Sequence, residues 1–149
     1  MITDVINEDV FKTPHKHIAF AINTEGSNDG GFAGQVTSRF VPELANTGGV
    51  QLGEIKTASA KGKTFYGLVC HSLSKGWENA PKIITECLDK IEVPDNEPIA
   101  IVLMGAGMIG TLSGADPRAN VKAIHASKKN CILYSLEYSK VAVEEAIKN

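Results

Sequence analysis

Four stretches of the chain are almost continuously apolar and have the length of buried strands. They are rich in β-branched and aromatic residues, and most of them do not alternate strictly between apolar and polar positions. A strand of this kind is buried on both faces, as in a sheet that lies between layers of helices. The four predicted strands cover residues 17–22, 64–70, 99–104 and 131–136.

Two further segments have a weaker strand pattern. Residues 50–58 form a predicted strand that is joined to the strand at 64–70 through Lys61, Gly62 and Lys63, which suit a hairpin turn. Residues 2–6 are predicted to form a first strand at an edge. Both segments extend the sheet beyond its four buried strands.

Helical patterns fall between the strands. Between residues 77 and 91, apolar side chains recur at steps of three and four, which places them on one face of a helix. Pro81 must then lie in the first turn of this helix, where its missing N–H costs little. Asp116 followed by Pro117 predicts a second helix start, because a capping carboxylate precedes a proline at the first helical position. Two more helices are predicted at residues 34–40 and 139–148.

The alternation of strands and helices predicts an α/β fold with a largely parallel or mixed sheet. The chain has 149 residues, which is the size of one domain, and we expect a single domain over residues 1–149. Its composition is 43% hydrophobic, which is enough for a packed core and argues against disorder. A formal net charge of -2 gives no electrostatic footprint for duplex nucleic acid.

The cysteines and the termini indicate a cellular compartment. Cys70, Cys87 and Cys131 each lie inside an apolar stretch and form no C-x-x-C pair, so we expect reduced core residues and no disulfide scaffold. No apolar run approaches the ~20 residues of a membrane span, and the first residues lack the pattern of a signal peptide. We therefore expect a cytoplasmic protein without a membrane partner.

The 14 glycines gather beside predicted strands, and two clusters are candidates for phosphate binding. The first cluster, in residues 23–34, follows a buried strand and leads into a helix. Such a junction presents unpaired N–H groups and the positive end of a helix dipole to an anionic ligand. The alternative is that Gly30 and Gly31 only form a tight turn, and spacing alone leaves both interpretations open.

The second cluster directly follows the strand at 99–104. Its glycines, Gly105, Gly107 and Gly110, have the G-x-G-x-x-G spacing of dinucleotide-binding proteins. A Rossmann domain normally begins with this unit and continues through several more strands, whereas only residues 137–149 follow the last predicted strand here. The next helix also starts at Asp116, well beyond the last glycine. These observations disfavour an NAD-binding Rossmann domain and favour a phosphate-binding loop of another kind.

Taken together, three motifs over residues 3–136 resemble those of macrodomains, the ADP-ribose-binding modules. Residues 4–11 resemble the family's opening, in which a strand leads to an acidic residue that recognises adenine, and this residue would be Asp9. Residues 21–34 are similar to the loop around the distal ribose, and residues 103–110 to the loop whose amides hold the diphosphate. The chain most resembles two subgroups, the terminal ADP-ribose protein glycohydrolases and the yeast-type ADP-ribose 1''-phosphate phosphatases.

This resemblance implies a three-layer fold and a set of ligand-binding residues. Backbone N–H groups can meet the two phosphate charges of ADP-ribose without a basic surface. A carboxylate can accept from the adenine amino group, and apolar side chains can form walls for the base. Tyr134 is a candidate aromatic face for the ligand, and the alternative, a half-buried strand residue, fits its position better. The predicted ligand-binding residues are Asp9, Val10, Ile22, Gly30, Gly31, Phe32, Ala33, Gly105, Ala106, Gly107, Met108, Ile109, Gly110 and Tyr134.

The catalytic positions of the two subgroups hold other residues in this chain. The lysine position of the glycohydrolases holds His71, and their aspartate position holds Ile109. Histidine forms no covalent adduct comparable to that of lysine, and isoleucine accepts no proton. The histidine position of the phosphatases holds Phe20. The predicted catalytic residues are therefore His71, Asn23 and Asp29, with His71 as general acid or base, unless it is only a strand-end histidine bonded to backbone.

These features predict a macrodomain that binds ADP-ribose or a derivative and hydrolyses an ADP-ribose-linked species, either a terminal 1''-phosphate or an ADP-ribosyl adduct. The alternative is a binding module without turnover that reads or sequesters ADP-ribosyl ligands. No cofactor and no metal are expected, because no cluster of His, Cys and Asp has the spacing of a zinc site. The expected partner is ADP-ribose or an ADP-ribosylated substrate, and nucleic acid only when it is itself ADP-ribosylated.

Overall fold

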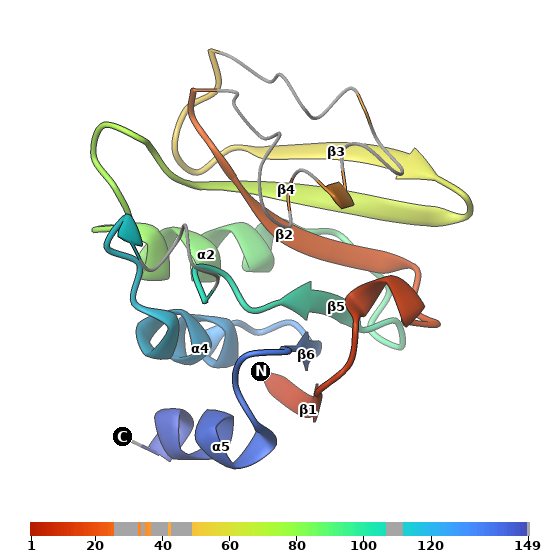
Figure 1. The fold of residues 1–149 in the computed structure, drawn as a ribbon. Coiled ribbons are helices and arrows are strands. Elements are labelled where there is room, and N and C mark those ends of the chain that lie inside the picture. Colours follow the sequence, from red (N-terminus) through yellow and green to blue (C-terminus); the bar gives the residue numbers. More distant parts are fainter. Residues whose placement is uncertain (26–32, 34, 37–41, 43–48, 107–111, 149) are drawn as a thin grey trace.

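Six strands form one mixed sheet in the order β1-β6-β5-β2-β4-β3 (Figure 1). The structure, a computed structural model, describes residues 1–25, 33, 35–36, 42, 49–106 and 112–148. Five strands are parallel, and β3 pairs antiparallel with β4 at one edge. The strands are β1 (Ile2–Ile6), β2 (His17–Asn23), β3 (Ile55–Ala60), β4 (Lys63–His71), β5 (Ile99–Val102) and β6 (Cys131–Tyr134).

The long helices lie side by side in Figure 1, from α2 through α4 to α5. Among the described residues, the complete helices are the short 3₁₀ helix η1 (Val10–Lys12), α2 (Ala80–Lys90), α4 (Pro117–Ala126) and α5 (Lys140–Lys148). Ala33, Gln35 and Val36 also have helical backbone, which agrees with the helix predicted after the first glycine cluster.

The sheet is buried on both faces, as its continuous apolar strands predict. On one face, Leu68 and Leu133 belong to the core cluster that contains Ile84 of α2 and Ile124 of α4. On the other face, Phe20, Phe65 and Val36 belong to a second cluster. Because apolar side chains leave water on both sides of the same strands, the parallel strands tolerate little polarity in their interior.

The strand boundaries differ from the predicted ones where an apolar run continues past the end of a strand. Leu103 follows β5 and still donates its N–H to the Tyr134 carbonyl of β6 at 3.1 Å, whereas Met104 stays buried beyond this bond by packing. Leu136 lies beyond the end of β6 and is 72% exposed. The predicted strand at 50–58 is shifted, since β3 begins only at Ile55, after Gly53 with a φ of +93°.

The turn and cap signals of the sequence are confirmed. Lys61 and Gly62 have φ angles of 53° and 77°, and they join β3 to β4 as a two-residue hairpin turn with both central residues left-handed. Pro81 lies in the first turn of α2, as predicted. The Asp116 carboxylate accepts a hydrogen bond from the Ala119 N–H at 3.2 Å and caps α4.

The three cysteines are free and buried, as expected. Burial raises the pKa of Cys131 to about 11, so this thiol stays protonated near neutrality. Within the described part of the chain, no helix has the length and apolarity that crossing a membrane requires.

Candidate functional site

Both glycine clusters begin at the same edge of the sheet. The strand before the first cluster, β2, pairs directly and in parallel with β5, which precedes the second cluster. The carboxyl ends of parallel strands lie at one edge, and ligands of open α/β sheets bind outside this edge. We call residues 23–25 the first root and residues 104–106 the second root. The two roots leave neighbouring strands in the same direction, as the hypothesis of a shared ligand site requires.

The first root is tied to the end of β4. The N–H of Thr24 donates to the carbonyl of His71 at 3.2 Å, and the Glu25 carboxylate accepts from the N–H of Leu73 at 2.8 Å. This hydrogen bond is the largest cause that lowers the pKa of Glu25, so the carboxylate is ionised near neutrality. Glu25 was not among the residues predicted from the sequence. Its partner is 48 positions away in the chain, so no local pattern indicates the contact.

His71 ends β4 and is stacked on an aromatic ring. The centroids of its imidazole and of the Trp77 ring system lie 3.9 Å apart, with an interplanar angle of 8°. Desolvation lowers the pKa of His71 from 6.5 to about 4, and the nearby charge of Glu25 opposes this shift only in part. His71 is therefore neutral near pH 7 and offers one N–H donor and one nitrogen acceptor.

Asn23, the other described residue with a predicted catalytic role, is a neighbour of His71. It is the last residue of β2 and is paired in register with His71 across the β2–β4 ladder, beyond a local irregularity. Its side chain is 6% exposed. The structure thus places Asn23 and His71, two of the three predicted catalytic residues, at the ends of adjacent strands.

The second root depends on a glycine. Gly105 has a φ of +79°, and a Cβ at this position would lie 2.5 Å from the Cβ of Ala115. A side chain at this position would strain the left-handed backbone and would clash with Ala115 unless neighbouring atoms moved. The buried Asn120 of α4 donates from Nδ2 to the Met104 carbonyl at 2.9 Å, which fixes the end of β5. Among the described residues, its Oδ1 atom has no hydrogen-bond partner.

Asp9 lies past the carboxyl end of β1 and has a structural partner. It is the N-cap of η1, and its Oδ1 accepts from the Phe11 N–H at 3.0 Å. A carboxylate has a second oxygen, so this bond leaves an acceptor for another donor such as an adenine amino group. The half-buried position of Asp9 is compatible with its predicted role.

Other residues predicted to bind the ligand are part of the core. Val10, Ile22 and Tyr134 are each no more than 3% exposed, and the Tyr134 hydroxyl donates to Thr13 Oγ1 at 2.8 Å. Ala33 is partly buried against the same cluster. These side chains all pack in the second core cluster, and their contact with a ligand stays a prediction.

The remaining predicted site residues are Ala106 and a group that lies outside the described residues. Ala106 is partly buried against the core cluster of α2 and α4. The predictions for Asp29, Gly30, Gly31, Phe32, Gly107, Met108, Ile109 and Gly110 lie outside the described residues.

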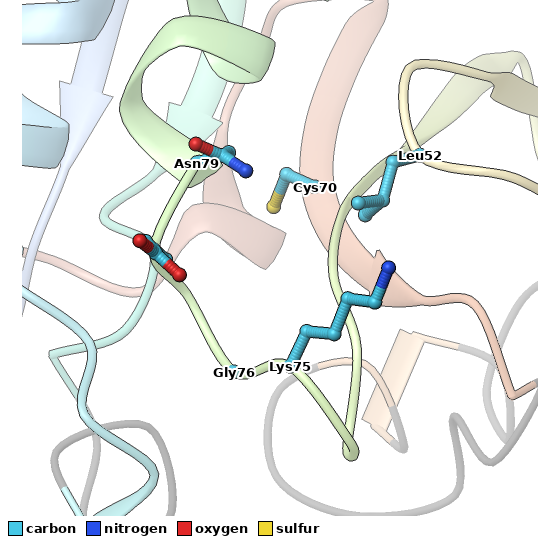
Figure 2. Close-up of a pocket in the computed structure, with 6 residues that line it drawn as sticks. Leu52, Cys70, Lys75, Gly76 and Asn79 are labelled. Atoms are coloured by element: carbon cyan, nitrogen blue, oxygen red, sulfur yellow. The ribbon is translucent and has the colours of Figure 1, made fainter.

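A cavity of about 160 Å³ lies beside the turn that follows β4 (Figure 2). Burial raises the pKa of Cys70, which lines this cavity, so the thiol stays protonated and is no nucleophile near neutrality. The lining residues are Leu52, Cys70, Lys75, Gly76, Glu78 and Asn79.

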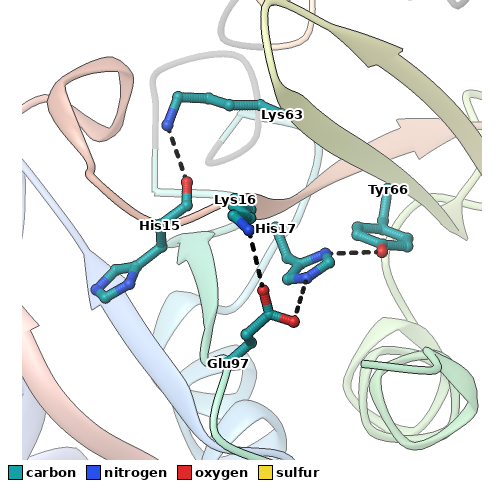
Figure 3. Close-up of polar contacts among 6 residues, drawn as sticks. All are labelled: His15, Lys16, His17, Lys63, Tyr66 and Glu97. Atoms are coloured by element: carbon teal, nitrogen blue, oxygen red, sulfur yellow. Dashed lines mark hydrogen bonds and ion pairs between the residues drawn. The ribbon is translucent and has the colours of Figure 1, made fainter. Parts of the chain in front are cut away.

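The opposite edge of the sheet carries a polar cluster at the start of β2 (Figure 3). His17 Nδ1 lies 3.0 Å from the Tyr66 hydroxyl, and His17 Nε2 lies 3.6 Å from a Glu97 carboxylate oxygen. Lys16 reaches the other oxygen of Glu97 at 3.7 Å. Lys63 donates to two backbone carbonyls that precede β2. His17 Nε2 has no hydrogen-bond partner in the part of the chain that the structure describes. Among the described residues, no group of three or more His, Cys, Asp and Glu is placed to hold a metal ion.

Comparison with known proteins identifies the fold. A macrodomain mutant of Oceanobacillus iheyensis, solved with ADPR, matches 99% of this chain and 95% of its own length, with a TM-score of 0.69 and 15% identity. The Trypanosoma brucei macrodomain in complex with ADP-ribose matches 97% of this chain and 66% of its own length, with a TM-score of 0.65 and 14% identity. The chain has the macrodomain fold.

The same fold is found within larger proteins. The alphavirus P23pro-zbd structure matches 95% of this chain with a TM-score of 0.68 and 17% identity, and this chain spans 22% of the length of the alphavirus chain. No protein-family model and no curated protein matches the sequence. The likeness therefore shows the macrodomain fold and does not assign the chain to one of the two subgroups that its sequence resembles.

Proposed function

We propose that this chain binds ADP-ribose at the carboxyl edge of its sheet, with the diphosphate between the first and second roots. The observation that carries this proposal is the direct parallel pairing of β2 with β5, which brings the starts of both glycine clusters together. Structures of the same fold from Oceanobacillus iheyensis and Trypanosoma brucei hold ADPR and ADP-ribose.

The described residues fit distinct parts of the ligand. In this proposal, backbone N–H groups of the two roots meet the phosphate charges, so a chain with a net charge of -2 needs no basic surface for this ligand. The free oxygen of Asp9 accepts from the adenine amino group. His71 and Asn23 face the distal ribose, where neutral donors and acceptors suit hydroxyl groups.

Isothermal titration calorimetry with ADP-ribose, ADP and NAD tests this proposal. ADP-ribose should bind most tightly, because ADP lacks the distal ribose and NAD carries an added base at its 1'' carbon. A preference for NAD would contradict the proposal, as would the absence of heat with both ADP-ribose and ADP.

Hydrolysis of an ADP-ribose-linked species is a second candidate, favoured by a hydrogen bond that the sequence did not reveal. The ionised Glu25 carboxylate accepts from the N–H of Leu73 at 2.8 Å, which places it at the turn that directly follows His71. In this proposal Glu25 takes the proton of an attacking water, and His71 orients the water or the leaving group. Both groups are weak bases near neutrality, because the pKa of His71 is about 4 and the pKa of Glu25 is lowered from 4.5, so hydrolysis ranks below binding as a candidate function.

Two assays separate turnover from binding alone. Phosphate release from ADP-ribose 1''-phosphate and loss of label from ADP-ribosylated protein measure the two predicted reactions. Glu25→Gln should abolish most of any turnover and retain ADP-ribose binding. If wild-type protein binds ADP-ribose and shows neither reaction, the chain is a binding module.

A further inference from the structure

Trp77 occupies a central place between β4 and α2. It is the one tryptophan of the chain and is 9% exposed. It follows residues 72–76, a turn closed by mutual backbone hydrogen bonds between Ser72 and Gly76 at 3.2 and 2.8 Å. Trp77 thus directly follows a closed turn, and its side chain belongs to the core cluster that also contains Leu68 and Ile84.

One face of the Trp77 ring system carries His71. The near-parallel stack, at 3.9 Å and 8°, covers one face of the imidazole and leaves the ring edge, with its two nitrogens, as the polar part. Stacking of this kind fixes the orientation of the ring and withdraws it from water, which agrees with the lowered pKa of His71.

The edge of the same indole lies against the second root. A Cβ on Gly105 would lie 3.6 Å from Trp77 Cζ3, so the glycine backbone is close to the ring. A Cβ on Gly76 would lie 3.3 Å from the Ser113 carbonyl oxygen, which brings the chain that returns from the second cluster to the same turn. The indole is thus in contact with the end of β4 and close to the end of β5.

His71 continues this series of contacts to the first root. Its carbonyl accepts from the Thr24 N–H, and the Glu25 carboxylate is bonded to the turn that follows His71. The first root, His71 and Trp77 therefore form a series of hydrogen-bonded and stacked groups, and Trp77, at the end of this series, lies near Gly105 of the second root. Energetic coupling between neighbouring subsites can travel through such a series.

We propose that Trp77 is a positioning residue that joins His71 to the second root, so that a diphosphate bound at the second root changes the environment of the His71 imidazole. This inference rests on the proposed function, because it takes from it a diphosphate between the two roots, and so in contact with the second root, and a distal ribose at His71. It adds that the two subsites are coupled and names the side chain that couples them. Coupling is reciprocal, so an intact His71–Trp77 stack also favours diphosphate binding.

ADP is the probe that isolates this coupling. It carries the adenosine and the diphosphate but no distal ribose, so a response of His71 to ADP is transmitted by the protein. We would titrate the full chain with ADP and follow three signals, which are the heat of binding, the His71 imidazole resonances in NMR spectra, and the fluorescence of Trp77. In the wild type, the NMR and fluorescence signals should change with the midpoint of the calorimetric titration.

Three variants test the role of the indole. Trp77→Leu should still bind ADP and lose the His71 response, and its ratio of ADP-ribose to ADP affinity should fall about fivefold, the low end of coupling between sites. Trp77→Phe keeps an aromatic face and should keep most of the His71 response, which covers the case that Trp77→Leu does not fold. Leu73→Ala is the control, because this side chain lies in the same turn and is 65% exposed.

The outcomes separate this inference from the function on which it rests. If ADP binds to the wild type and the His71 resonances do not move, the coupling is refuted and ADP binding stands. An equal His71 response in Trp77→Leu and the wild type also refutes it. If neither ADP nor ADP-ribose produces heat, the proposed function fails, and the coupling fails with it.

Discussion

The two edges of the sheet each carry a histidine on a central strand, and the two residues are held in different ways. His17, at the start of β2, has the Tyr66 hydroxyl 3.0 Å from Nδ1, while its Nε2 lies 3.6 Å from the Glu97 carboxylate and has no hydrogen-bond partner among the described residues. His71, at the end of β4, is held by its ring face against Trp77. The amino edge therefore holds its imidazole among polar side chains, whereas the carboxyl edge fixes an imidazole by aromatic packing.

The backbone shows the same difference. At the amino edge, the Lys63 ammonium group donates hydrogen bonds to the carbonyls of Thr13 and His15, in the segment that leads into β2. At the carboxyl edge, Gly105 adopts a left-handed angle, and the buried Oδ1 of Asn120 has no partner among the described residues. Each edge thus has one buried polar atom without a hydrogen bond among the described residues, His17 Nε2 and Asn120 Oδ1. The edges differ in their backbone, because side-chain hydrogen bonds hold the amino edge and a left-handed glycine forms part of the carboxyl edge.

The largest expected effect that tests this comparison is at Gly105. In Gly105→Ala, the new Cβ meets Ala115 at 2.5 Å and the φ of +79° strains the backbone, so we expect a loss of about 3 kcal/mol in the free energy of unfolding and weaker ADP-ribose binding. Urea denaturation and calorimetry measure the two losses.

Gly114→Ala is the matched control for this substitution. Gly114 has a φ of +89°, and no atom of the described residues lies within 4 Å of a Cβ there, so only the backbone strain of about 1 kcal/mol remains. Equal losses in the two variants would show that the close packing of the second root is unimportant.

Asp9 separates a capping role from a ligand role at the carboxyl edge. Asp9→Ala should weaken ADP-ribose binding by about 2 kcal/mol, because a hydrogen bond to a charged group is lost, and should destabilise η1 by about 1 kcal/mol. Asp9→Asn retains a capping oxygen and should retain the stability. Its affinity should still fall, because its single carbonyl oxygen is used by the cap. Unchanged affinity in both variants would place adenine elsewhere.

The pH dependence of stability tests how His71 is held. Its folded pKa of about 4 lies below its ordinary 6.5, so the unfolded chain binds more protons between these values. Stability should therefore fall as the pH drops from about 6.5 to about 4. We expect a loss of about 1–2 kcal/mol after a discount for the partly exposed ring. His71→Phe should show a smaller loss in urea denaturation at pH 7 and pH 4.5, and an unchanged slope would contradict the desolvated stack.

The smallest effect is expected at the amino edge. Tyr66→Phe removes the hydroxyl that bonds His17 and should cost about 1 kcal/mol of stability. Thermal or urea unfolding measures this loss. ADP-ribose affinity should not change, and a clear change would show that the two edges are not independent.

Much of the fold could be predicted because its signals are local. The apolar strands, the Lys61–Gly62 turn and the Asp116 cap all depend on neighbouring residues, and the structure confirms them. Strand ends were less predictable, since Met104 is buried by packing beyond the last residue of β5. Local pattern cannot distinguish burial in a strand from burial beside one.

For the candidate site, the sequence by itself determined which segments carry glycine clusters and that each follows a buried strand. It also determined that His71 and Asn23 lie at strand ends. Only the tertiary structure decided that β2 lies between β5 and β4, which brings these ends together. It alone placed Trp77 against His71 and near Gly105, and Glu25 against Leu73. Strand order and stacking arise from the burial of side chains that are far apart in the chain, and such contacts leave no periodic signal in the sequence.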